Sequence, residues 1–205
     1  MGIWHWLFAM RTVNQLSDKN HRTETIDVAK INTPSYYADF TRVAPMAEEV
    51  VIYFGTLTRV AESDEYQAKV SLHLVMSKYT AKRLHTALCH AVENAEAQRG
   101  IVDTGAKSPQ EHVDIIASAK DLYPTYVNFV RVAVMPEETV LDFGLNRNDL
   151  GADQAVTISD SVVMNHHSLK RLMEQLGLFI KQIESRSGEI ETDVRRRLSQ
   201  KSTSE

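Results

Sequence analysis

Two stretches of the chain repeat one pattern of aromatic, β-branched and polar positions. The first, YYADFTRVAPMAEEVVIYFG, covers residues 36–55, and the second, TYVNFVRVAVMPEETVLDFG, covers residues 125–144. In each stretch, two runs rich in aromatic and β-branched residues flank a short turn, which predicts a β-hairpin. Matching residues lie 89 positions apart here and 88 apart further on, as between Met76 and Met164. We therefore infer a tandem duplication of a unit of about 90 residues.

Further strands are predicted on both sides of each hairpin. Residues 24–31 (ETIDVAKI) and 68–76 (AKVSLHLVM) alternate apolar and polar side chains, as half-buried strands do. The second copy of the latter, AVTISDSVVM, carries Asp160 near its middle. We expect that strand either to bulge or to lie at a sheet edge. Residues 109–118 combine the signals of a short helix with those of a strand, and the repeat favours a strand.

A helix follows the last strand of each copy. Apolar residues recur at helical spacing from Leu84 to Ala95 and again from Leu172 to Ile183. Gly100 and Gly188 stand where each helix is expected to end. The pattern predicts an α+β fold of two tandem units, each with four antiparallel strands followed by one helix, packed as a pseudo-dimer.

The unit boundaries follow from this pattern. We assign residues 1–22 to a hydrophobic arm and linker, 23–100 to the first unit, 101–111 to a linker, 112–188 to the second unit and 189–205 to a polar tail. Because one helix covers one sheet face and both hairpin faces are apolar, the units are expected to pack by sheet face or strand edge. Apolar surface left uncovered would favour association with a partner.

Centring each hairpin on its turn predicts a register. It pairs an arginine with a glutamate and a phenylalanine with a valine in both copies: Arg42–Glu49, Phe40–Val51, Arg131–Glu138 and Phe129–Val140. A charge pair across two strands contributes about 0.2–1 kcal/mol. The recurring arginine and glutamate are therefore interpreted as structural.

Composition narrows the class of protein. The chain has 205 residues, of which 43% are hydrophobic and 24% charged, with a net charge of −4, as in ordinary globular proteins. This balance gives no reason to expect a nucleic-acid partner. The single cysteine, Cys89, cannot form an internal disulfide, so a reducing, cytoplasmic location is expected. The apolar start, with Trp4 and Trp6, reaches Arg11 after ten residues and is expected to dock on the body or on a partner rather than on a membrane.

One pair of residues has the spacing of a chemical site. His85 and Cys89 lie at i and i+4 of the first helix, where they could offer two zinc ligands or a nucleophile and its base. Their counterparts in the second copy are Met173 and Gly177, and no further ligand has motif spacing. We therefore predict no metal, no cofactor and no catalytic residue.

The repeated motifs resemble a known family. YADF, EEVVIYF and MSKYTAKRL in the first copy, and YVNF, EETVLDF and MNHHSLKRL in the second, are similar to the bacterial and archaeal family called domain of unknown function 3467. The first copy departs from it at Asp39 and Tyr53, where the family favours Asn and Asp, whereas the second keeps Asn128 and Asp142. The resemblance implies no activity. The order of four strands and a helix is also similar to SecB-type export chaperones, in topology alone.

These observations favour a non-enzymatic protein-interaction module that binds another protein or a second copy of itself. The candidate binding residues are the aromatic and β-branched side chains of the hairpins and the arm: Tyr37, Phe40, Val51, Tyr126, Phe129, Val140, Trp4 and Trp6. The alternative is a SecB-like chaperone that holds unfolded polypeptides. An enzyme is a third reading, and it would need convergent polar residues in a pocket.

Overall fold

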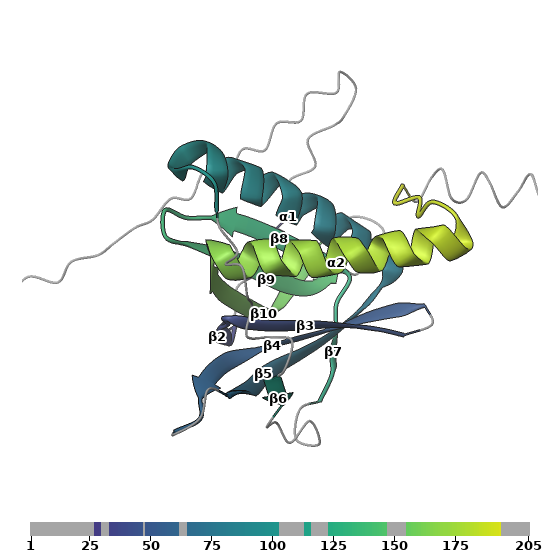
Figure 1. Ribbon diagram of the computed structural model, residues 1–205. Coiled ribbons are helices and arrows are strands. Elements are labelled where there is room, and N and C mark those ends of the chain that lie inside the picture. Colours follow the sequence, from purple (N-terminus) through teal and green to yellow (C-terminus); the bar gives the residue numbers. More distant parts are fainter. Residues whose placement is uncertain are drawn as a thin grey trace, which may run out of the picture.

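The computed structural model is shown in Figure 1. It describes residues 27–29, 33–46, 48–61, 65–102, 113–115, 123–146 and 155–193. The apolar arm, with Trp4 and Trp6, lies outside these residues, and so does the end of the polar tail.

The two units have the same order of elements. The first contains β1 (Asp27–Ala29), β2 (Ser35–Tyr37), β3 (Phe40–Pro45), β4 (Glu49–Arg59), β5 (Tyr66–Ser77) and α1 (Lys78–Arg99). The second contains β6 (Val113–Ile115), β7 (Thr125–Tyr126), β8 (Phe129–Val134), β9 (Glu138–Asn146), β10 (Ala155–Asn165) and α2 (His166–Ser187). The predicted α+β order is confirmed, and the start of each predicted hairpin forms a separate short strand, β2 or β7. Residues 113–115 form a strand, as the repeat predicts.

The first strands of each unit pair with the sheet of the other unit. Antiparallel β3, β4 and β5 form one sheet, and antiparallel β8, β9 and β10 form the second. From the first unit, β1 and β2 pair with β10, whereas β6 and β7 from the second unit pair with β5. These exchanged strands run parallel to their partners, unlike the rest of each sheet. The exchange makes the pseudo-dimer an intertwined one.

The helices also pack across the units. α1 packs against β8 and α2 against β3, and the two helices lie side by side over the strands (Figure 1). Residues of both units form a common core, at whose centre the rings of Phe54 and Phe143 lie 5.7 Å apart. The leucines of the two predicted stripes, such as Leu84 and Leu172, are fully buried in it. Each unit therefore completes its core with side chains of the other.

Two equivalent ion pairs tie the helices together. Lys82 Nζ lies 2.7 Å from Glu184 Oε1, and Lys170 Nζ lies 2.8 Å from Glu96 Oε1. Each glutamate also accepts a backbone N–H from the segment that follows its helix. Hydrogen bonds from the lysines are the largest influence that lowers the pKa of Glu96 and Glu184. The lysine of each AKRL or LKRL sequence therefore fastens the start of one helix to the end of the other.

The hairpin register differs from the predicted one. Arg42 pairs with Tyr53 and Phe40 with Gly55, and the second copy pairs Arg131 with Asp142 and Phe129 with Gly144. The predicted pairs Arg42–Glu49, Phe40–Val51, Arg131–Glu138 and Phe129–Val140 are therefore wrong. β3 continues to Pro45, and the N–H of Met46 donates to the carbonyl of Glu49, so the turn is tighter and lies later in the sequence. The observed partner of each residue differs from the predicted one by an even number of positions. Because side chains alternate between the two faces of a strand, each side chain still lies on the same face of the sheet as the predicted register would place it.

The last strand of each unit, β5 or β10, contains a bulge. The pairing slips between Phe54 and Gly55 in the first sheet and between Ile158 and Asp160 in the second. The bulge expected in β10 is confirmed, and β10 lies inside its sheet rather than at an edge. Beyond the first bulge, Phe40, Ala68 and Val70 form a separate small cluster away from the common core.

Candidate functional site: a pocket between the first hairpin and the second helix

The predicted binding residues do not form one exposed face. Tyr37 and Tyr126 are 48% and 47% exposed and belong to different sheets, in β2 next to β10 and in β7 next to β5. Phe40 and Val51 are buried, whereas Phe129 and Val140 are partly buried. The two tryptophans, Trp4 and Trp6, lie outside the described residues.

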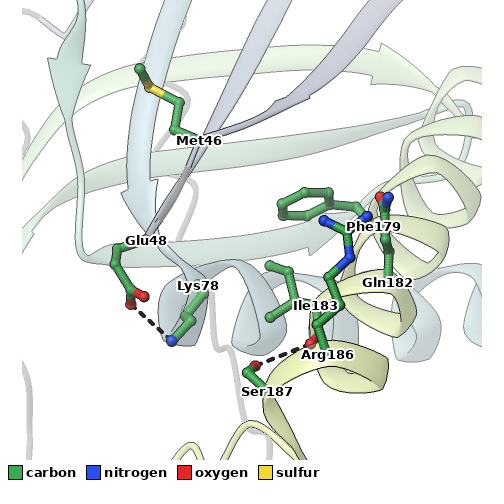
Figure 2. Close-up of a pocket in the computed structure, with 8 residues that line it drawn as sticks. All are labelled: Met46, Glu48, Lys78, Phe179, Gln182, Ile183, Arg186 and Ser187. Carbon is green, nitrogen blue, oxygen red and sulfur yellow. Dashed lines mark hydrogen bonds and ion pairs between the residues drawn. The ribbon is translucent and has the colours of Figure 1, made fainter.

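A pocket of about 370 Å³ opens between the tip of the β3–β4 hairpin, the first residue of α1 and the last turns of α2. It is lined by Met46, Glu48, Lys78, Phe179, Gln182, Ile183, Arg186 and Ser187. Figure 2 shows Glu48 and Lys78 on one side, the α2 side chains on the other and Met46 at the far end. The sequence pattern did not predict this pocket.

The pocket has an apolar wall and a charged rim. Phe179 is 8% exposed and joins the common core, and Ile183 is partly buried against that core. On the rim, Lys78 Nζ lies 2.8 Å from Glu48 Oε2. The hydrogen bond that Lys78 donates to Glu48 is the main cause of the raised pKa of Lys78, which stays charged at neutral pH. Among the described residues, no acidic side chain forms an ion pair with Arg186.

His85 and Cys89 lie where α1 crosses α2. Cys89 Sγ lies 3.7 Å from His85 Nε2, and the same nitrogen lies against Gly177, where a Cβ would be only 2.7 Å away. Burial is the main cause that raises the pKa of Cys89 and lowers that of His85. A raised thiol pKa opposes the thiolate that a nucleophile or a metal ligand requires. Three or more potential metal ligands do not come together anywhere in the described part of the chain.

The two positions at which the first copy departs from the family pattern, Asp39 and Tyr53, correspond to residues that hold neighbouring strands together in the second copy. The first of these contacts is to the backbone. Asn128 Nδ2 donates to the carbonyl of Asn146 (3.0 Å), and the N–H of Asn146 donates to Asn128 Oδ1 (2.6 Å). Asp39, the counterpart of Asn128, accepts one such bond, from the N–H of Leu57 at 2.7 Å. These side chains close the sheet just before each hairpin.

The second clamp lies across the hairpin. Arg131 Nε donates to Asp142 Oδ2 at 3.0 Å, and Ser161 donates to the other oxygen of this carboxylate. In the first unit, Tyr53 replaces the aspartate and stacks on His73 with ring centroids 4.7 Å apart. The motif residues therefore hold strands together in both units.

The family model described as Protein of unknown function (DUF3467) matches the chain twice, over residues 10–104 and 101–192. The chain belongs to the DUF3467 family. The comparison with curated proteins gives no match. In the part of the chain that the structure describes, no helix is long and apolar enough to cross a membrane.

The pocket lies where the two DUF3467 units differ. At the equivalent place, between the β8–β9 hairpin and α1, the guanidinium of Arg99 donates two hydrogen bonds to Glu137, at 3.0 and 3.1 Å. The counterpart of Arg99 is Ser187, which donates instead to the carbonyl of Ile183. Arg186 has Gln98 as its counterpart. An ion pair thus bridges helix and hairpin at one end, whereas a pocket opens at the other.

A second difference between the units is a buried acid. Asp160 is 6% exposed and lies opposite Phe143, where the first unit places Leu72 opposite Phe54. Burial raises the pKa of Asp160. The pKa of Tyr36 is also raised, mainly by burial and then by the charge of Asp160.

We expect Asp160→Leu to stabilise the protein by about 1–2 kcal/mol at neutral pH, because it removes a poorly compensated buried charge. Since the folded-state pKa is above the unfolded value, the cost of this charge is absent below the unfolded pKa and grows as pH rises through the folded pKa. The gain should therefore shrink in urea melts below about pH 4. Asp160→Asn is the control, because it removes the charge of the side chain and keeps its polarity. A gain that is the same at every pH would contradict the argument.

Proposed function

We propose that this protein is a non-enzymatic interaction module whose pocket between the β3–β4 hairpin and α2 receives a segment of another protein. The observation that carries the proposal is an apolar wall, Phe179 and Ile183, beside Arg186, which has no acidic partner in the part of the chain that the structure describes. The intertwined DUF3467 pair would act as the rigid support for that pocket. The residues shared by the two units supply clamps and ion pairs inside the fold, which fits a scaffold.

The chemistry of the lining favours binding over catalysis. The titratable side chains of the pocket are Glu48, Lys78 and Arg186. Glu48 and Lys78 form an ion pair with each other. A general acid or base needs a pKa near the working pH, and a raised pKa moves Lys78 away from it. We therefore propose a partner rather than a substrate.

The test is affinity capture of the full-length protein from a native lysate, read by mass spectrometry with two matched variants. Gln182→Trp fills the pocket from an exposed position of α2, and Asn94→Trp places the same side chain at the equivalent exposed position of α1. We expect one or two partners in fixed ratio with the wild type and with Asn94→Trp, and their loss with Gln182→Trp.

Other outcomes would change the proposal. A broad set of unrelated unfolded proteins would favour the SecB-like chaperone, which would hold its clients without a fixed ratio. Partners retained by Gln182→Trp would place the binding surface elsewhere. Light scattering of the purified protein separates a second copy of the chain from a different partner.

A further inference from the structure

The charges around the pocket do not balance. Lys78 and Glu48 neutralise each other across 2.8 Å, so Arg186 adds one positive charge. At the equivalent place, between the β8–β9 hairpin and α1, Arg99 and Glu137 form a pair, and Gln98 stands in the position of Arg186. Among the described residues, the pocket end therefore carries one cation without an ionic partner, where the other end has Gln98.

This cation is placed beside an apolar surface. The side chain of Arg186 points back along α2 toward Phe179 and Gln182 (Figure 2). Met46, which is 57% exposed, lies across the pocket from this wall. A volume of about 370 Å³ is at the small end of the range for ligand sites and suits one or two side chains rather than a folded domain. The ligand that matches this arrangement has an apolar group and an anion next to each other.

The second rim charge limits the anion. The carboxylate of Glu48 also lines the pocket, and its side chain is 75% exposed. Either anion can accept two parallel hydrogen bonds from the arginine, but a doubly charged phosphate would be repelled more strongly than a carboxylate by the exposed Glu48, whose charge Lys78 offsets. A carboxylate is therefore the better match.

We propose that the pocket recognises a short acidic and apolar peptide segment of a partner protein, in which a Glu or Asp carboxylate binds Arg186 while a neighbouring large apolar side chain packs on Phe179 and Ile183. This proposal rests on the proposed function and specifies its ligand. Recognition depends on the differences between the two DUF3467 units, because the equivalent place between the β8–β9 hairpin and α1 has Gln98 and the Arg99–Glu137 ion pair.

The test uses two fluorescein-labelled peptides, Ser-Phe-Glu-Leu-Ser and its twin Ser-Phe-Gln-Leu-Ser, titrated with the full-length protein by fluorescence anisotropy. We expect the acidic peptide to bind about fivefold more tightly at low salt, since an exposed ion pair is worth up to about 1 kcal/mol. In about 1 M salt the two peptides should bind about equally tightly, because salt screens the ion pair.

Arg186→Gln copies the residue found at the equivalent position, and we expect it to abolish the preference by weakening the binding of the acidic peptide about fivefold. Arg99→Gln removes a cation at the other end and should keep the preference. Equal binding of the two peptides to the wild type, binding of neither peptide, or a preference that survives Arg186→Gln would overturn the proposal.

Affinity capture separates this failure from that of the proposed function. If Gln182→Trp loses the partner and Arg186→Gln retains it in full, the pocket binds a partner whose segment is not acidic. If both variants retain the partner, the pocket is not the binding site, and both proposals fail.

Discussion

Gly144→Ala is expected to cost about 3 kcal/mol of unfolding free energy, or more. Gly144 lies opposite the bulge of β10, and a Cβ there would overlap the carbonyl oxygen of Thr157 and lie 3.0 Å from Ile158 Cα. Both obstacles belong to the backbone of a strand inside the sheet, so no flexible side chain can move to make room. The substitution must push apart β9 and β10, which carry the common core.

Two further glycines make the test specific. Gly55 holds the equivalent position against the carbonyl of Lys69, so Gly55→Ala should cost a similar amount. Gly188 has a φ of +82° and nothing within 4 Å of a Cβ, so Gly188→Ala should cost only about 1–2 kcal/mol of backbone strain. Urea denaturation measures all three. A loss for Gly144→Ala no larger than that for Gly188→Ala would contradict the steric argument.

Local periodicity predicted the elements of this fold but not the exchange between the units. The hairpins, the long last strands and the helices follow from side-chain alternation and helical spacing, and the repeat confirmed each element twice. Whether residues 27–29 pair with β5 or with β10 is not encoded in that alternation, because either sheet offers the strand a similar apolar surface.

The predicted hairpin register was wrong for a related reason. A shift by an even number of residues buries the same side chains, and the turn chemistry around Pro45 did not distinguish the two registers.

The pocket could not be predicted because its walls are distant in sequence. Met46 and Glu48 come from a turn in the first unit, whereas Phe179 and Arg186 come from the helix of the second. The packing of α2 on β3 brings them together. A signal existed in the comparison of the two copies, since Arg186 stands where the first helix has Gln98 and Phe179 where it has Ala91. These differences indicate a binding site only when the fold shows that the residues line the same pocket.

Arg131→Ala should destabilise the protein by about 2–3 kcal/mol, whereas Arg42→Ala should cost no more than about 1 kcal/mol. The side chain of Asp142 is 3% exposed and pairs with Arg131, so removing the arginine takes a positive charge away from a buried carboxylate. Arg42 is exposed and pairs across the hairpin with Tyr53, so its loss strands no buried charge.

The double variant Arg131→Leu with Asp142→Leu separates the charge from the packing. It removes both ions together, so it should recover most of the stability that Arg131→Ala loses. Urea melts of the four proteins, wild type included, give the comparison.

Equal losses of stability for Arg131→Ala and Arg42→Ala would mean that the carboxylate of Asp142 does not depend on its arginine. The same aspartate that the family pattern favours would then have to be explained by something other than the closure of the hairpin. If the expected order is found, Tyr53 in the first unit marks a clamp that was replaced by ring stacking on His73, and the two units hold their hairpins together by different chemistry in one fold.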